Sequence, residues 1–162
     1  MQTLIADLIR STRQHHAIEH ATLHLLAARR PGESFSGISD PWGFTILGEV
    51  DEPTLRKAVG DALLHLHAGE RHLAIHPNCG GNLAVAGLIV TLVALLAGGG
   101  RRPFWDRYPT ALIFVLPALV LARPLGYHVQ RYTTLADVAD RWVAAIEPVE
   151  LFGAQAHRIS FV

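Results

Sequence analysis

The sequence has little of several features that reveal the class of a protein. It contains one cysteine, Cys79, which excludes an internal disulfide and leaves a thiol that is either free or a metal ligand. The 14 basic and 14 acidic residues cancel, which removes the electrostatic basis for nucleic-acid binding. The first 14 residues lack a continuous apolar core, so we predict no secretory signal and expect a cytoplasmic N-terminal domain.

Apolar residues make up 50% of the 162 residues, and their excess is local. Residues 83–99 form a nearly uninterrupted apolar run without charge, and a second run at 110–122 reaches spanning length when residues 108–127 are counted. The Arg, Trp and Tyr residues at 101–108 are typical of a membrane interface. We therefore predict a transmembrane helical hairpin at 83–126. The alternative is a pair of buried core helices in a soluble protein.

The rest of the chain predicts an α+β fold in two segments. Residues 1–82 are expected to form a metal-binding domain with a long helix, a three-stranded sheet and a second helix, and residues 127–162 to pack on it. The expected elements are a helix at 3–29, a β-hairpin at 34–50, a helix at 52–68 capped by Asp51, a strand at 71–75, an amphipathic helix at 133–146, and a strand at 157–162 that returns to the sheet.

The pattern His16-Ala-Ile-Glu19-His20 lies inside the expected first helix. Residues four apart project from one helix face about one turn from each other, which is the spacing that two zinc ligands need. Glu19 is offset from His16 by about 60° around the helix, where its carboxylate can reach a metal-bound water without being a ligand. A helical histidine is more often a surface or hydrogen-bonded core residue. Here both imidazoles lie in an apolar stripe, where unpaired polar groups are costly, so we predict a Zn²⁺ site.

A second chemical feature is the loop His76-Pro-Asn-Cys79-Gly-Gly81-Asn82. The thiolate of Cys79 or the imidazole of His76 would complete a tetrahedral site with His16 and His20. We take Cys79 as the third ligand and His76 as a hydrogen-bond donor to an oxyanion. Three protein ligands leave a position open for water, which Glu19 can activate, whereas four ligands close the site and make it structural.

The His-x-x-Glu-His pattern resembles that of the inverted zincin metallopeptidases, in which the two histidines hold zinc and the Glu is the general base. The resemblance is limited to the five residues from His16 to His20. These enzymes take their third ligand from a distant Glu, and Glu70 is the residue that this resemblance offers as an alternative to Cys79.

A wider set of motifs resembles an uncharacterised bacterial family of small membrane proteins, found for example in cyanobacteria and Chloroflexi. The resemblance covers about residues 15–125, with Gly81 in place of an expected Thr, and implies no activity. The motifs are His16-Ala-Ile-Glu-His-Ala-Thr22, Gly37-Ile-Ser-Asp40, Gly43-Phe44, Gly69-Glu70 and Leu73-Ala-Ile-His-Pro-Asn-Cys79-Gly.

The function that we expect is a membrane-embedded zinc-dependent hydrolase, namely a metallopeptidase. Glu19 would deprotonate a water on zinc held by His16, His20 and Cys79, for attack on a peptide or protein substrate near the bilayer. The edge of the small sheet would align an extended substrate. The alternatives are a non-catalytic scaffold with a closed structural zinc, or a metal or redox sensor that uses Cys79.

The expected location is the bacterial inner (cytoplasmic) membrane, which the chain crosses more than once, with the lipid bilayer as its partner. Ala118, Ala122 and Gly126 form a ladder of small residues on the second apolar run. Such a ladder permits close helix packing, either within the hairpin or between the two chains of a homodimer.

Overall fold

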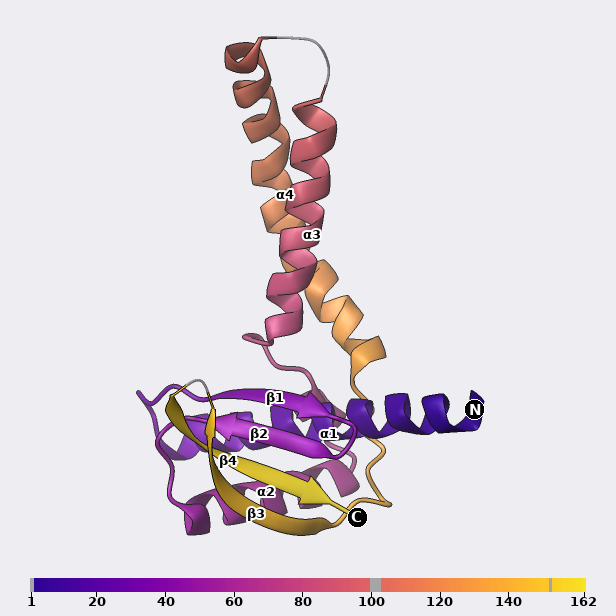
Figure 1. Ribbon diagram of the computed structural model, residues 1–162, viewed down its shortest axis with the longest axis vertical. Coiled ribbons are helices and arrows are strands. Elements are labelled where there is room, and N and C mark those ends of the chain that lie inside the picture. The colour runs from indigo at the N-terminus through magenta and orange to yellow at the C-terminus, as the bar shows by residue number, and fades with distance from the viewer. Residues whose placement is uncertain (1, 100–102, 152) are drawn as a thin grey trace. The chain divides into compact units, whose positions relative to one another are not determined.

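The computed structural model describes residues 2–99, 103–151 and 153–162 and divides the chain into two units (Figure 1). The first unit comprises the residues up to His76 together with 133–162, and the second comprises 77–132. The mixed helix and sheet content and the two apolar helices agree with the predicted α+β class. Among the described residues the elements are α1 (Gln2–Arg29), β1 (Ser36–Asp40), β2 (Gly43–Leu47), α2 (Glu52–His67), the 3-10 helix η1 (Arg71–Ala74), α3 (Gly80–Ala97), α4 (Phe104–Thr133), β3 (Val143–Leu151) and β4 (Ala154–Phe161).

The two helices of the first unit lie where the sequence predicts them. Helix α1 ends at Arg29, just before Pro31 and Gly32, which do not continue a helix. Helix α2 begins after Asp51, whose carboxylate accepts a hydrogen bond from the Thr54 amide at 3.0 Å. Helix α1 is buried only between Gln14 and Leu26, and not along its whole length as the apolar stripe predicts.

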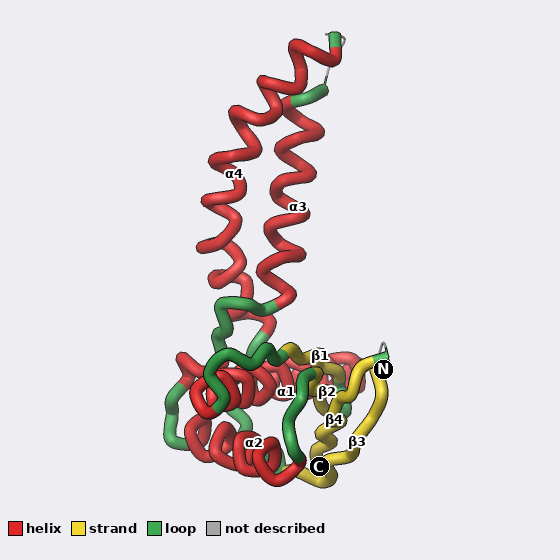
Figure 2. The backbone as a smooth tube through the Cα atoms, turned by 90° about the vertical axis from the view of Figure 1, so that its left-hand side faces the viewer, coloured by secondary structure: helices red, strands yellow, loops and turns green. Residues whose placement is uncertain are grey.

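The first unit also contains an antiparallel sheet of four strands, counted over the described residues, in the order β1-β2-β4-β3. The predicted hairpin is confirmed as β1 and β2, and the C-terminal strand does return to the sheet, because β4 pairs with β2. Helices α1 and α2 cover one face of the sheet (Figure 2). The core between the layers includes Ala17, Ile18, Ala21, Leu26, Phe44, Ile46, Leu55, Val59, Ala62, Ile146 and Ile159.

The predicted strand at 71–75 is wrong, since residues Arg71–Ala74 form the 3-10 helix η1. The backbone carbonyls of Ala74 and Ile75 accept hydrogen bonds from histidine rings of α1, at 2.7 and 2.8 Å. This segment is therefore bonded to α1 and not to a strand, and the free side of β2 is taken by β4 instead.

The predicted amphipathic helix at 133–146 is also wrong. Residues 134–142 form an irregular segment whose backbone bonds to α1: the Gln14 side chain donates to the Asp137 carbonyl at 2.8 Å, and the Leu135 amide donates to the Arg13 carbonyl at 2.8 Å. Strand β3 then begins at Val143 as an edge strand, where Pro148 is tolerated. A side chain and a backbone carbonyl of α1 thus replace hydrogen bonds that a helix would have made internally.

The second unit consists of α3 and α4, which run side by side (Figures 1 and 2). Both helices are long and apolar enough to cross a membrane, with mean hydropathies of 2.1 and 1.7 over their spans. The apolar window of α3 is entirely unburied, so its surface is suited to lipid. The two helices pack closely where the Asn82 side chain lies against Gly126 and accepts a hydrogen bond from Gln130 at 2.6 Å. The predicted interfacial residues Arg101 and Arg102 lie outside the described residues.

Replacing Gly43 with Ala should destabilise the first unit, because a Cβ there would lie 2.0 Å from the Ile159 carbonyl oxygen of the paired strand. Overpacking of this kind costs about 1 to 3 kcal/mol or more. The matched control is Gly60→Ala, where a Cβ meets nothing within 4 Å in the middle of α2, and where Ala should stabilise by about 0.5–1 kcal/mol. Thermal unfolding followed by circular dichroism in detergent should therefore move in opposite directions for the two variants. Unchanged unfolding of Gly43→Ala would contradict the β2–β4 register.

Candidate metal centre

The predicted ligands His16 and His20 lie together on α1. Their ring centroids are 4.3 Å apart, and a ring nitrogen of each lies within 4.8 Å of one of the other. Zinc binds histidine nitrogen at about 2.0–2.1 Å, so small rotations of the two side chains would bring both nitrogens to bonding distance of one ion. The helical spacing read from the sequence therefore gives a pair of adjacent nitrogens in the fold.

Backbone carbonyls hold both rings in a ligand-like orientation. His20 Nδ1 lies 2.7 Å from the Ala74 carbonyl oxygen, and His16 Nδ1 lies 3.2 Å from that of Thr133. Because a carbonyl only accepts hydrogen bonds, each Nδ1 is the donor and each Nε2 carries the lone pair. His20 Nε2 is buried and has no hydrogen-bond partner among the described residues. A metal-bound histidine usually shows this arrangement, with one nitrogen fixed by a carbonyl and the other on the metal.

The surroundings keep these imidazoles neutral. Burial lowers the pKa of His20 to about 3, with a further contribution from the neighbouring His16. Burial also lowers the pKa of His16, and it lowers that of His76 to about 4 together with the nearby His24. The neutral ring is the form that binds a metal, so at neutral pH no proton has to be displaced from these ligands.

The carboxyl group of Glu19 lies against strand β1. It is buried, with 4% of the residue exposed, and it accepts a short hydrogen bond from the Ser39 hydroxyl. A Cβ at Gly37 would lie 2.5 Å from Glu19 Oε1, so the absence of a side chain at position 37 makes room for the carboxyl group. Burial raises the pKa of Glu19 to about 7 although the Ser39 hydrogen bond opposes this. A group with such a pKa can accept and return a proton near neutral pH.

Two more histidine rings adjoin the pair. The ring of His76 lies 5.7 Å from that of His20 and 4.7 Å from that of His24, measured between centroids. His24 donates from Nε2 to the Ile75 carbonyl at 2.8 Å. His24 is not among the ligands predicted from the sequence, although its position at i+8 from His16 extends the same helical stripe. The repeat of histidine every four residues, at 16, 20 and 24, was the feature of the sequence that could have identified His24 as a neighbour of the site.

The two remaining candidate ligands are Glu70 and Cys79. Glu70 follows α2, and its carboxylate accepts a hydrogen bond from His65 Nδ1 at 2.7 Å, with both side chains 42% exposed. Cys79 belongs to the second unit, where it caps α3 and accepts a hydrogen bond from the Gly81 amide at 3.4 Å. Cys79 follows His76 by three residues, and three residues span at most about 11 Å, so the chain limits the distance between Cys79 and His76.

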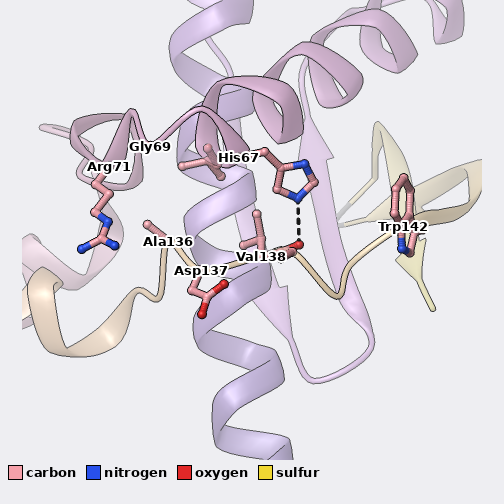
Figure 3. Close-up of a pocket in the computed structure, with 9 residues that line it drawn as sticks. His67, Gly69, Arg71, Ala136, Asp137, Val138 and Trp142 are labelled. Atoms are coloured by element: carbon pink, nitrogen blue, oxygen red, sulfur yellow. Dashed lines mark hydrogen bonds between the residues drawn. The ribbon is translucent and has the colours of Figure 1, made fainter.

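A pocket of about 410 Å³ lies in the first unit between the end of α2 and residues 136–142 (Figure 3). His67 donates from Nε2 to the Val138 carbonyl at 3.1 Å in its wall, with Trp142 on one side and Arg71 on the other. Its lining residues do not include the predicted ligands or Glu19. This pocket is therefore separate from the histidine cluster.

Comparison with known proteins places the chain in a family. Residues 11–146 match the family described as "Domain of unknown function (DUF6391)". The chain belongs to this family. It is also 36% identical over 140 residues to an uncharacterized protein of Picosynechococcus sp. (strain ATCC 27264 / PCC 7002 / PR-6), over 76% of this chain and 65% of that protein. The chain thus spans about two thirds of that relative's length.

The match agrees with the expected resemblance to an uncharacterised bacterial family. No solved structure matches the chain.

The raised pKa of Glu19 predicts a pH-dependent stability for the metal-free protein. Between the ordinary pKa of 4.5 and the folded value of about 7, the folded protein holds a proton that the unfolded chain releases. The contribution of Glu19 to stability is therefore fully present below pH 4.5 and is lost as the pH rises through 7. Glu19→Gln lacks this ionisation, so in chelator it should be more stable than the wild type by about 1 to 3 kcal/mol at pH 8. The difference should shrink towards pH 4.5. A difference that does not vary with pH would contradict the buried protonated carboxyl.

Proposed function

We propose that this protein is a membrane-embedded zinc-dependent hydrolase that cleaves peptide bonds. The observation that carries the proposal is the buried Nε2 of His20, which has no hydrogen-bond partner among the described residues while Nδ1 is fixed by the Ala74 carbonyl. An unpartnered buried nitrogen is costly, and a metal ion satisfies it. The neighbouring His16, bonded in the same way to the Thr133 carbonyl, supplies a second nitrogen for the same ion.

The donor set fits zinc better than the hard cations. Neutral imidazoles and a thiolate are ligands that zinc prefers, whereas calcium and magnesium select oxygen. We propose the Cys79 thiolate as the third ligand, because the short tether from His76 keeps it near the histidine pair. His76 remains the alternative third ligand. Zinc with three protein ligands supplies a Lewis acid and a bound water of lowered pKa.

Glu19 is the proposed general base. Its carboxyl group lies one residue before His20 on the helix and is held by Ser39 and the space at Gly37. With a pKa raised to about 7, it would accept a proton from the attacking water and deliver it to the leaving amine. The imidazole of His76, beside His20, is the proposed hydrogen-bond donor to the oxyanion that forms from the substrate carbonyl.

The position of β1 supports an extended peptide as the substrate. Strand β1 is at an edge of the sheet, and its residues Gly37 and Ser39 contact the side chain of Glu19. An extended peptide that adds to a free strand edge forms main-chain hydrogen bonds without regard to its sequence. A peptide bound at β1 would therefore pass beside the proposed base.

We place the protein in the bacterial cytoplasmic membrane, with α3 and α4 as its spans and the first unit in the cytoplasm. The exposed apolar surface of both helices supports membrane association. Cys79 lies just before α3, so a site that includes it would be close to the bilayer surface. The proposed substrates are accordingly peptides or proteins near the membrane. The DUF6391 family carries no assigned reaction to compare with this proposal.

A closed structural zinc site is the second candidate, and the number of nearby donors favours it. His20 adjoins both His16 and His76 in the first unit, so with these three as ligands Cys79 would be a fourth. Four ligands leave no position for water. In that case the protein would be a scaffold, or a sensor that releases metal when the thiolate is oxidised.

Metal analysis tests the site. We expect about one zinc per chain in the detergent-purified protein, lost in His20→Ala and strongly reduced in Cys79→Ala. His72→Ala is the matched control, because His72 is an exposed histidine outside the cluster and should leave the zinc content unchanged. Inductively coupled plasma mass spectrometry gives the stoichiometry. Absence of stoichiometric metal from the wild type would rule out the hydrolase. Full zinc content in Cys79→Ala would assign the third ligand position to His76 instead of Cys79.

Peptidase assays separate the two candidates. Glu19→Gln should keep its zinc and lose activity by a factor of about 10²–10⁴, which is the usual contribution of a general base. Gly37→Ala should keep its zinc and lose part of the activity, because the new Cβ displaces the Glu19 carboxyl group. Activity can be followed with a quenched-fluorescent peptide library in proteoliposomes. Equal activity of Glu19→Gln and the wild type, at full zinc occupancy, would favour the structural site.

A further inference from the structure

The N-terminal part of α1 carries apolar side chains that the described chain leaves uncovered. Leu4, Ile5 and Ile9 are 61%, 53% and 55% exposed, and they precede the buried half of the helix. The opposite side of the same turns carries Asp7 and Arg10. Figure 1 shows this end of α1 extending beyond the sheet. This segment is amphipathic, with its apolar face open to whatever surrounds the first unit.

Two of the three uncovered residues lie on the side of α1 that carries the candidate metal centre, whereas Leu4 lies about 120° from His16. At 100° per residue, Ile5 and Ile9 each lie within about 20° of His16 around the helix axis. Along this side of α1, starting from its N-terminus, apolar residues are followed by His16, His20 and His24. The apolar end is exposed, and further along this side of the helix His20 is buried under the Ala74 carbonyl.

Both connections to the second unit leave the first unit along this side of α1. At one connection the Ala74 and Ile75 carbonyls accept from His20 and His24. At the other the Thr133 carbonyl accepts from His16. Ala74 and Ile75 lie three and two residues before the segment 77–132, and Thr133 directly follows it. The two segments that connect the first unit to α3 and α4 therefore both start beside the histidines of α1.

From this placement we infer that the N-terminal turns of α1 lie in the interfacial layer of the bilayer that α3 and α4 cross. The inference rests on the proposed membrane embedding. Helix α3 begins four residues after His76, and such a connection covers at most about 14 Å, so the histidine face is held near the membrane surface. An amphipathic helix there gains free energy by burying its apolar face about 5–10 Å into the headgroup region.

Lipid is a better occupant of this face than a second copy of the chain. The bilayer is present at the connections in every molecule, at high effective concentration, whereas a second chain must be recruited. The face is also short, about two turns, and flanked by charges, as in helices that lie at an interface. The consequence for the proposed peptidase is that its site would open towards the membrane surface and act on peptide bonds close to it.

The test measures the depth of spin labels in the full chain, reconstituted in phosphatidylethanolamine–phosphatidylglycerol vesicles. A ketone-bearing amino acid at position 9, 7 or 92 accepts a nitroxide without modifying Cys79. The label at Ile9 should collide more with oxygen than with a water-soluble nickel complex, at a depth of about 5–10 Å. The label at Asp7, on the opposite face, should show the reverse. The label at Leu92, inside α3, reports the spanning helix independently.

Each remaining outcome overturns the inference in a distinguishable way. If the Leu92 label is deep but the Ile9 label is as accessible to nickel as the Asp7 label, the spans stand and the interfacial helix is wrong. Dipolar broadening between Ile9 labels on different chains would assign the face to a second copy. If the Leu92 label is itself exposed to water, the membrane embedding fails, and the inference fails with it.

Discussion

The hydrogen bonds between histidine rings of α1 and three backbone carbonyls are the constraint on which much of this structure depends. In the first unit, the carbonyls of Ala74, Ile75 and Thr133 each accept a hydrogen bond from a histidine ring of α1. The same bonds fix the tautomers of His16 and His20. One set of interactions thus attaches the segments around Ala74 and Thr133 to α1 and turns Nε2 of each candidate ligand away from the carbonyl that holds its ring.

The helix carries polar groups at a cost that the rest of the fold offsets. Gln14, His15, Glu19 and His20 are buried in α1, where unpaired polar atoms would cost several kcal/mol in total. Gln14 is satisfied by the Asp137 carbonyl and by Asp140, and Glu19 by Ser39. His20 Nε2, His15 Nε2 and Arg13 Nε are the buried polar atoms of α1 without a hydrogen-bond partner among the described residues. The His20 nitrogen differs from the other two because its ring lies beside that of His16, the second candidate ligand of the motif, and this arrangement points to a metal.

Particular residues show where sequence reasoning succeeded. Asp51 and Pro53 predict the start of α2 because capping and proline geometry act over a few residues, and the His16–His20 spacing predicts adjacent rings because helical periodicity is local. Prediction from the sequence failed at 71–75 and 133–146, because the structure of these segments depends on hydrogen bonds to residues more than 50 positions away. The Glu19 environment was equally hidden, since nothing in the sequence of β1 reveals that Gly37 and Ser39 face α1.

The sequence by itself determined the two apolar helices, the long first helix, the β1–β2 hairpin and the order of His16, Glu19 and His20 on one helix, because periodicity and hydropathy are properties of short segments. Only the tertiary structure decided that β4 completes the sheet, that His15 faces Phe161 while its neighbour His16 faces His20, and that Glu19 is buried against β1. These outcomes depend on which distant groups satisfy buried donors and acceptors, and a local pattern does not specify that choice.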